Sequence, residues 1–303
     1  MKGTDRALAM SVDGNGRFVL LDPRQGARLA LAEAARNVAC AGAVPIGASN
    51  CLNFGNPERP EIMWQFAEAV AGLGEACRAL EIPITGGNVS LYNETDGKAI
   101  LPTPVIGVVG LIEHADRMLT RVFPAPGLDV VLLGEGRGEL GGSEYLLNVH
   151  GLVRGVPPVL DLNREKSLLA LMATLAAERR VRSAHDCAEG GLAVTLAECS
   201  FGTGGVGLTV DVPAADAPAA WASASTLFSE SASRVVVSAT AENVGAVLAR
   251  ARDLGVPARE IGTTGTGRIS VSINGRKVID MAVGEGETIW DGALGKFFKQ
   301  RAA

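Results

Sequence analysis

Residues 50–57, NCLNFGNP, and residues 85–93, TGGNVSLYN, together form the densest cluster of unusual residues in the chain. Each follows an apolar segment and places Asn and Gly where a strand should end. Amide oxygens at such positions can ligate Mg²⁺, amide nitrogens can donate to phosphate, and glycine lets a backbone N–H approach a phosphate closely. Because Asn and Gly are also the ordinary residues of turns, local composition alone favours a structural role over a binding role.

The sequence around these stretches alternates strand-like runs with helical periodicity. Residues 7–12 and 17–21 lie on either side of DGNG at 13–16, whose Asp-Gly and Asn-Gly steps predict a hairpin turn. Farther along, apolar residues recur every three or four positions in two segments, which predicts helices. These helices are expected at residues 28–41 and from Pro60 to Leu80, and a buried strand is expected at residues 105–112.

A change of domain is expected where the run RMLTRVFPAPGL, residues 117–128, brings two prolines and a glycine together. We place the boundary near residue 122, which gives domains at residues 1–122 and 123–303. The second domain alternates strand-like and helix-like segments, which indicates an α/β layer with helices packed on a mixed sheet. Strands are predicted at residues 129–134, 182–186, 206–212, 234–239 and in a β-rich tail at 258–283, and helices at residues 162–180, 192–199 and 241–254.

Composition excludes several classes of protein. The chain has 303 residues, 47% of them hydrophobic, and a formal net charge of −5, which argues against binding dominated by nucleic-acid phosphates. Its five cysteines are odd in number and form no C-x-x-C pair, which fits a reducing compartment. No signal-peptide core follows Met1, and no window approaches the roughly 20 apolar residues of a membrane span. We therefore expect a cytoplasmic protein that binds neither nucleic acid nor membrane.

Three further clusters have both a binding and a structural interpretation. Asp186 and Glu189 could bind a metal or cap the helix expected near Gly190, and capping is the commoner use of such residues. Residues 227–234 place one carboxylate among three hydroxyls, for which solvated loop polarity is the safer expectation. The glycine run at residues 134–142 could hold phosphate at a helix N-terminus near Ser143 and Glu144, although it lacks the Gly-Lys-Ser/Thr ending of a P-loop.

Taken in order, five blocks of this chain closely resemble the large subunit of formylglycinamidine ribonucleotide synthase. The resemblance covers essentially the whole chain, and the blocks occur with the spacing of that family. They are LDPRQGARLALAEAARNVACAGAVPIGASNCLNFGNPE at 21–58, ITGGNVSLYNET at 84–95, LPTPVIGVVGLIE at 101–113, HDCAEGGLAVTLAE at 185–198 and LFSESASRVVVS at 227–238.

This resemblance implies an aminoimidazole ribonucleotide synthetase-like fold, with an N-terminal ferredoxin-like α+β domain followed by an α/β domain. Enzymes of the family carry two copies of such a pair, and this chain resembles the second copy. The family's active site lies between the copies, with its catalytic histidines in the first. The resemblance therefore implies that this half contributes no catalytic residue.

The family's binding residues in this half are carried over at four positions. Gly87 resembles a glycine that contacts ATP, Asn88 an asparagine that ligates Mg²⁺, and Ser90 a serine that contacts the ribonucleotide substrate. Asn50 stands where many members have an ATP-contacting aspartate. An amide there keeps hydrogen-bonding capacity but removes a negative charge, which weakens any interaction with a cation.

The implied function is half of an ATP-dependent carbon–nitrogen ligase of purine biosynthesis, which uses Mg²⁺ and makes formylglycinamidine ribonucleotide from the formylglycinamide, ATP and glutamine-derived ammonia. Its implied partners are the missing N-terminal half, a glutaminase subunit and a small subunit. An alternative is a structural module without its own ligand site, which would associate as a homodimer through an unpaired β surface. A stand-alone kinase of the same superfamily is disfavoured, because an Asp-Asp-Ala-rich nucleotide block is absent.

Overall fold

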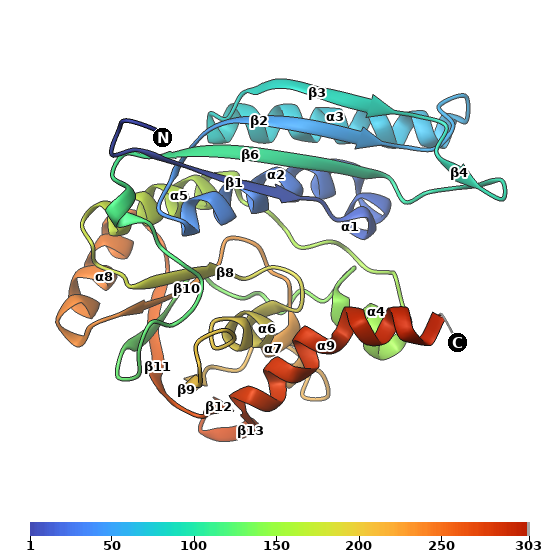
Figure 1. Cartoon of the computed structure of the whole chain (residues 1–303). Coiled ribbons are helices and arrows are strands. Elements are labelled where there is room, and N and C mark those ends of the chain that lie inside the picture. The colour runs from blue at the N-terminus through green and yellow to red at the C-terminus, as the bar shows by residue number, and fades with distance from the viewer. Residues whose placement is uncertain (302–303) are drawn as a thin grey trace.

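Two sheets with helices between and around them form the protein (Figure 1). The computed structural model describes residues 1–301, with side chains described through residue 298. The strands of the first sheet are β1 (Ala7–Asp13), β2 (Val44–Asn53), β3 (Ile84–Ser90) and β6 (Thr103–Ile112), and a ribbon of β4 (Glu94–Thr95) and β5 (Lys98–Ala99) extends from it. The strands of the second sheet are β7 (Asp129–Leu133), β8 (Ser183–Asp186), β9 (Val206–Val212), β10 (Val235–Ala239), β11 (Ala258–Thr266), β12 (Arg268–Ile273) and β13 (Arg276–Ala282).

The helices divide between the two sheets in chain order. Those of the first part are α1 (Gly16–Leu21), α2 (Pro23–Cys40), α3 (Pro60–Leu80) and a 3₁₀ turn at Ala115–Arg117. Those of the second part are α4 (Glu144–His150), α5 (Leu162–Ala177), α6 (Gly191–Glu198), α7 (Ala222–Phe228), α8 (Ala241–Asp253) and α9 (Val283–Arg301). No helix in the described part of the chain combines the length and apolar character needed to cross a bilayer.

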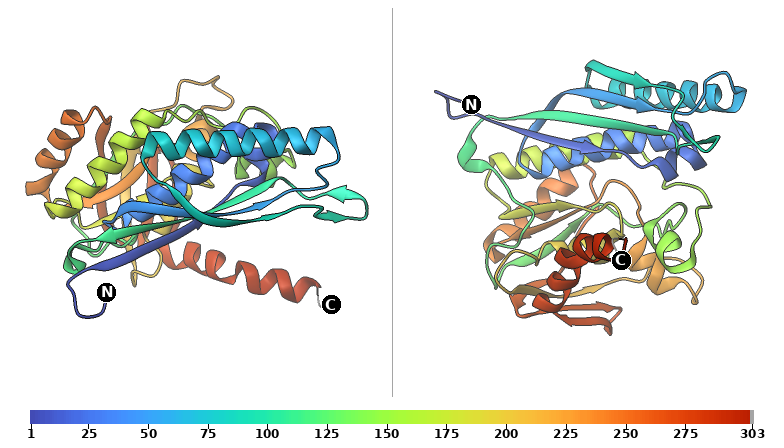
Figure 2. Two further views of the ribbon diagram at one scale, coloured as in Figure 1. Left: turned by 90° about the horizontal axis from the view of Figure 1, so that it is seen from above. Right: turned by 45° about the vertical axis from the view of Figure 1, so that its right-hand side comes forward.

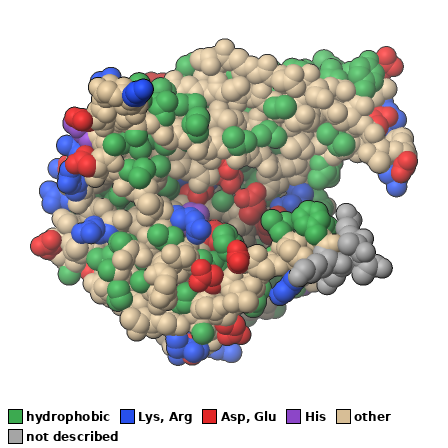
Figure 3. Space-filling model, viewed as in Figure 1, with side chains coloured by type: hydrophobic (Ala, Val, Ile, Leu, Met, Phe, Trp, Pro, Cys, Tyr) green, Lys and Arg blue, Asp and Glu red, His purple; other side chains and the backbone are tan. Residues whose placement is uncertain are grey.

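The first sheet has one covered face and one open face. Its strand order is β1-β6-β2-β3, and α2 and α3 pack on one side of it (Figure 2). On the other side, alternate residues of β1 and β2 leave apolar side chains in solvent, with Met10 75% and Val12 69% exposed. Figure 3 shows hydrophobic side chains spread over this side. We call this surface the open face; its large exposed side chains are Leu8, Met10, Val12, Val44 and Ile46.

The second sheet is mixed and is covered on both faces. Its order is β13-β12-β9-β11-β7-β10-β8, with β12 and β9 parallel and the other neighbours antiparallel. Side chains of α5 and α8 share one buried core with α2, while side chains of α6 share a second core with β9 and β12. Because α2 also contacts β1, β6 and β8, it connects the two sheets. The expected fold class, helices packed on mixed sheets, is confirmed.

The predicted hairpin at residues 7–21 is wrong. β1 pairs with β6 instead, and residues 16–21 form α1. The reason is that the Asn15 side chain accepts hydrogen bonds from the backbone N–H groups of Arg17 and Phe18, both at 3.1 Å, and so caps a helix rather than turning a hairpin.

The other predicted helices and strands are present, with shifted ends. The helix at Pro60 begins as expected, whereas the helix expected at residue 28 begins at Pro23, because Asp22 accepts the Gln25 N–H at 2.9 Å and caps it earlier. The helix start expected near Ser143 and Glu144 is that of α4, whereas α7 and α9 were not predicted from the sequence.

Candidate functional site

The four predicted binding residues lie on two neighbouring parallel strands. β2 pairs with β3 so that Asn50 is opposite Gly87, Cys51 opposite Asn88, and Asn53 opposite Ser90. β3 is an edge strand of the first sheet, and most of it is exposed. The two Asn/Gly-rich stretches that are 30 residues apart in sequence therefore meet at one sheet edge.

Asn50 and Gly87 are in such close contact that position 87 must be glycine. A Cβ atom on Gly87 would lie 1.8 Å from Asn50 Oδ1 and 2.7 Å from the Asn50 backbone oxygen. Both distances are far below van der Waals contact, and the second involves backbone that cannot rotate away. Asn50 is also paired with the fully buried Ile106 of β6, so its side chain is on the helix-covered side of the sheet.

Asn88 and Ser90 lie on the opposite side, the open face. Side chains alternate along a strand, so Cys51, Asn88 and Ser90 share the side that carries Val12 and Met10. Asn88 is exposed and donates from Nδ2 only to Cys51 Sγ, at 3.7 Å, which leaves its Oδ1 without a protein partner in the described residues. The pairing of β2 with β3 thus brings the four residues to one end of the sheet, with Asn50 and Gly87 on the helix-covered side and Asn88 and Ser90 on the open face.

Asn93 fixes the loop that follows β3. Its Nδ2 donates to the backbone oxygens of Phe54 and Ser90, at 3.0 and 2.9 Å, and to Ser90 Oγ at 3.0 Å. Phe54 is fully buried and packs edge-on against Phe66. The turn interpretation of these Asn-rich stretches is therefore correct for Asn93, which positions Ser90 by holding the ends of both strands.

A second polar cluster lies between the two sheets. Asp13 ends β1 and accepts from Ser11 Oγ at 2.7 Å and Asn37 Nδ2 at 3.2 Å. Burial raises the pKa of Glu33 well above its usual value, and the negative charges of Glu189 and Asp186 raise it further. Sequence reasoning missed Asp13 and Glu33, because residues so far apart in the chain give no local spacing signal. In the described residues no group of three His, Cys, Asp or Glu side chains has metal-binding geometry.

Glu33→Gln is expected to stabilise the chain at neutral pH. The folded-state pKa of Glu33 lies above its unfolded value near 4.5, so ionisation opposes folding as pH rises above that value. Denaturant unfolding in buffer with a metal chelator should give equal free energies of unfolding for both proteins near pH 4.5. Towards pH 8 the free energy of unfolding of the variant should increasingly exceed that of the wild type. The exposed Glu61 of α3 supplies the control, Glu61→Gln, which should show no such divergence. Parallel curves for wild type and Glu33→Gln would contradict the prediction.

Arg36 supplies the positive charge that this buried region needs. It is 3% exposed, donates from Nη1 to Glu165 Oε1 at 2.8 Å, and places Nε 3.7 Å from Asp186 Oδ2. Ser233 also donates to Glu165. Because Arg36 belongs to α2 while Glu165 and Asp186 belong to α5 and β8, this network joins the two sheets electrostatically.

The expectation that residues 227–234 form a solvated loop is wrong. Ser229, Glu230, Ser231 and Arg234 are all buried. Glu230 Oε1 accepts the backbone N–H groups of Gly190 and Glu144, at 2.9 and 2.8 Å. Burial raises the pKa of Glu230 to about 7, although these two N–H groups oppose the shift.

Glu230 also decides the two remaining sequence expectations. No side chain caps α6 at Gly190, so capping by Asp186 or Glu189 is wrong, and Glu230 binds that amide instead. At the start of α4, the N–H of Glu144 is likewise bound by Glu230, and Ser143 Oγ accepts from Leu146 N at 3.2 Å. The protein's own groups therefore occupy the helix N-terminus where a phosphate was considered.

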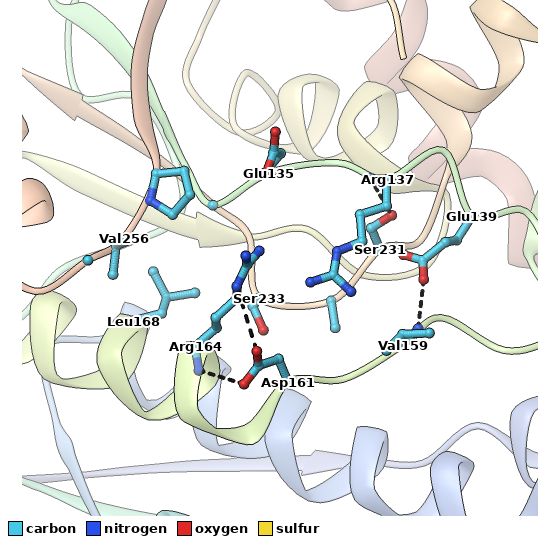
Figure 4. Close-up of a pocket in the computed structure, with 14 residues that line it drawn as sticks. Glu135, Arg137, Glu139, Val159, Asp161, Arg164, Leu168, Ser231, Ser233 and Val256 are labelled. Atoms are coloured by element: carbon cyan, nitrogen blue, oxygen red, sulfur yellow. Dashed lines mark hydrogen bonds and ion pairs between the residues drawn. The ribbon is translucent and has the colours of Figure 1, made fainter. Parts of the chain in front are cut away.

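A small cavity of about 30 Å³ lies beside the 134–139 loop (Figure 4). Two of its acidic side chains already have structural partners. Glu139 accepts the Val159 N–H at 2.7 Å, and Asp161 accepts the first N–H groups of α5, from Asn163 and Arg164. This cavity is too small for a nucleotide or a ribonucleotide, and its polar groups fasten the loop and cap the helix.

Two family models match successive parts of the chain. The model for AIR synthase related protein, N-terminal domain, matches residues 2–112, and the model for AIR synthase related protein, C-terminal domain, matches residues 125–274. Similar curated proteins include phosphoribosylformylglycinamidine synthase subunit PurL from Moorella thermoacetica, 48% identical over 290 residues, and from Thermobifida fusca, 50% identical over 280 residues. These alignments cover 96% and 89% of this chain but 39% and 36% of those proteins, so the chain spans less than half their length.

Solved structures share the fold at low sequence identity. PurL from Thermotoga maritima, complexed with FGAR, gives a TM-score of 0.79 at 17% identity, over 93% of this chain and 46% of that one. The hydrogenase maturation protein HypE gives 0.69 at 20% identity, over 92% of this chain and 88% of that one. The second comparison shows that the pair of domains seen here matches most of another protein chain.

Proposed function

Because the chain belongs to the AIR synthase related family, with curated PurL relatives at up to 50% identity, we propose that it is half of a phosphoribosylformylglycinamidine synthase. In this proposal it supplies one side of a composite site for ATP, Mg²⁺ and the formylglycinamide ribonucleotide. The observation that carries the proposal is the position of Asn88 and Ser90 on the apolar open face. A partner that buries this face would bring its own residues next to these two side chains.

The chemistry proposed for the complete enzyme needs this half for placement. ATP would phosphorylate the formylglycinamide amide oxygen and leave as ADP. Ammonia would then attack the carbon that carries this oxygen, and phosphate would leave to give the amidine. Ser90 would orient the ribonucleotide, and the missing side chain of Gly87 keeps Asn50 in place against β3. These residues act by positioning, and we propose that the groups that transfer protons belong to the other half.

Asn88 fits one Mg²⁺ ligand but not a whole site. Its amide oxygen has no protein partner in the described residues and faces outward, as a ligand for a hard cation requires. No carboxylate bonds to Asn88, so the remaining ligands would come from ATP and the other half. Bound Mg²⁺ would neutralise charge on the triphosphate.

Co-expression with the missing half tests the proposal. This chain alone should form no amidine, and the co-expressed pair should form it from ATP, ammonia and formylglycinamide ribonucleotide. Light scattering should also show that the isolated chain self-associates, and that addition of the N-terminal half replaces this self-association with a complex of the two halves. Two well-folded halves that associate without activity, with ammonia supplied directly, would reject the enzymatic assignment.

Asn88→Ala is expected to raise the Mg²⁺ concentration needed for half-maximal turnover by about tenfold in the reconstituted enzyme, a loss typical of weakened metal ligation. Asn88→Asp should need less Mg²⁺ for half-maximal turnover than Asn88→Ala does, because its carboxylate still offers an oxygen ligand. Asn148→Ala, on the exposed surface of α4, is the control. An unchanged Mg²⁺ titration for Asn88→Ala would remove this residue from the site.

Three coarser assignments accompany the proposal. We place the domain boundary near residue 122, supported by first-sheet strands ending at Ile112 and second-sheet strands beginning at Asp129 in the described structure. All five cysteines are free, which supports a reducing, cytoplasmic setting. The glutaminase and small subunits remain proposed partners. In the alternative, a purely structural module, two copies of the chain would dimerise through the same open face.

A further inference from the structure

The second sheet carries a cleft that the proposed ligase chemistry does not use. It has a volume of about 450 Å³, within the usual range for small-molecule sites. It opens where β7 and β9 end and β11 begins, on a different sheet from the β2–β3 edge. Much of its wall is apolar, contributed by Leu132, Leu192, Val212, Pro213 and Pro257.

Arg234, a buried cation, lines this cleft. Arg234 is 1% exposed and belongs to the loop before β10. It donates from Nε to the Ser231 oxygen at 2.9 Å and from Nη2 to the Ser229 oxygen at 2.7 Å. No carboxylate in the described residues forms an ion pair with Arg234, although the negative charges of Glu139 and Glu230 act on it from a greater distance. Burial outweighs their effect and lowers the pKa of Arg234. A buried guanidinium that donates only to neutral carbonyls can gain from a further acceptor that carries a negative charge.

The third nitrogen of Arg234 faces Gly136. Nη1 has no hydrogen-bond partner among the described residues, and a Cβ atom added to Gly136 would lie 3.2 Å from it. The same added atom would lie 3.9 Å from Ser229 Oγ, a buried hydroxyl that also lacks a partner. Arg234 thus keeps one unpaired donor beside a glycine in the cleft wall, with the unpaired hydroxyl of Ser229 buried behind that glycine, although buried donors are normally paired.

The charges at the rim do not neutralise Arg234. Glu135, Asp216 and Arg259 line the cleft, and all three are exposed to solvent. Their charges are screened by water, whereas the charge on Arg234 is not. The cleft lining therefore carries two acidic and two basic side chains, of which only Arg234 is buried.

We propose that this cleft binds a small organic anion, with its oxyanion group on Arg234 Nη1 and its apolar body against the walls. A carboxylate and a phosphate monoester share this chemistry, because each offers oxygens that accept from a guanidinium group. Gly136 gives the oxyanion access, since a side chain there would separate it from the guanidinium. The site is independent of the ATP and substrate site proposed on the first sheet.

Titration calorimetry of the full chain tests the proposal with three probes at constant ionic strength. Phenyl phosphate and benzoate supply a phosphate and a carboxylate on the same apolar ring, and benzamide supplies the ring without charge. At least one anion should bind saturably in the millimolar range or tighter, and which one binds identifies the source of the oxyanion. Benzamide should bind at least about tenfold more weakly, as expected for loss of a charge-assisted contact.

Gly136→Ala places the binding in the cleft. Gly136 has an ordinary backbone angle, so alanine should be tolerated while its methyl group blocks Nη1. Anion affinity should fall about tenfold or more. Gly245→Ala, on α8 with open space around it, is the matched control and should bind as wild type does. Arg234→Met should abolish binding, and Gly136→Ala decides the question if that variant does not fold.

Three results would overturn the proposal. The first is no saturable binding of either anion, and the second is equal binding of benzamide. The third is anion binding that survives Gly136→Ala but is lost in Asn88→Ala, because this pattern would place the anion on the first sheet. That outcome would leave the ligase assignment standing, so the two proposals fail separately.

Discussion

Gly87→Ala is expected to reduce amidine formation by the reconstituted enzyme at least about 100-fold, because displacement of binding groups by about 1 Å has effects of that size. The new Cβ would overlap the Asn50 side chain and its backbone oxygen, so β2 and β3 would have to separate. Their separation would move Asn88 and Ser90 together with the strand. The isolated variant should also lose about 1–3 kcal/mol of unfolding free energy, as overpacked sites do.

The neighbouring glycine provides the control for this experiment. Gly86 lies on the same strand, and a Cβ there meets no atom within 4 Å. Gly86→Ala should leave the unfolding free energy nearly unchanged. If Gly87→Ala matches Gly86→Ala in both activity and stability, the close contact between Asn50 and Gly87 is not required for either.

Arg36→Met is expected to lower the free energy of unfolding by about 3–5 kcal/mol, the usual cost of removing one partner from a buried ion pair. The substitution leaves Glu165 fully buried and takes the neighbouring positive charge away from Asp186. Since these acids belong to the second sheet and Arg36 to α2, the variant should weaken the attachment of one sheet to the other. Denaturant unfolding with fluorescence and circular dichroism measures the loss and shows whether the two signals still coincide.

Two companion variants show that the loss arises from the buried charge. Arg250→Gln removes an exposed pair with Glu178 and should change stability little. The double variant Arg36→Met/Glu165→Met should recover part of the loss, because no unpaired acid then remains at position 165. An Arg36→Met protein as stable as Arg250→Gln would refute this account.

Local patterns predicted most of the fold because they report on single elements. The apolar spacing after Pro60 predicted α3, and the apolar run ending at Ile112 predicted β6. The sequence also indicated that the Asn50 and Gly87 stretches lie at strand ends, but their pairing as neighbours was seen only in the structure. Their separation onto two faces depends on the register of β2 against β6 and β3, which no local pattern specifies.

Features that depend on distant contacts were not predictable. DGNG at 13–16 has a hairpin composition, but β1 pairs with the remote β6, and Asn15 then caps α1. Most of residues 229–234 are polar, yet Ser229, Glu230, Ser231 and Arg234 are buried, and Glu230 binds the amides at the starts of two remote helices. The cluster around Glu33 unites residues from three separate segments, and only the assembled fold brings them together.

The open face also limits how the isolated chain can be engineered for solubility. Polar replacements would reduce its tendency to aggregate, but those next to β3 would disturb the strand that carries Asn88 and Ser90. Leu8 and Met10 are safer targets, because β1 forms the opposite edge of the sheet. A chain made soluble this way would suit ligand titrations, whereas the unmodified face would be needed for assembly with the other half.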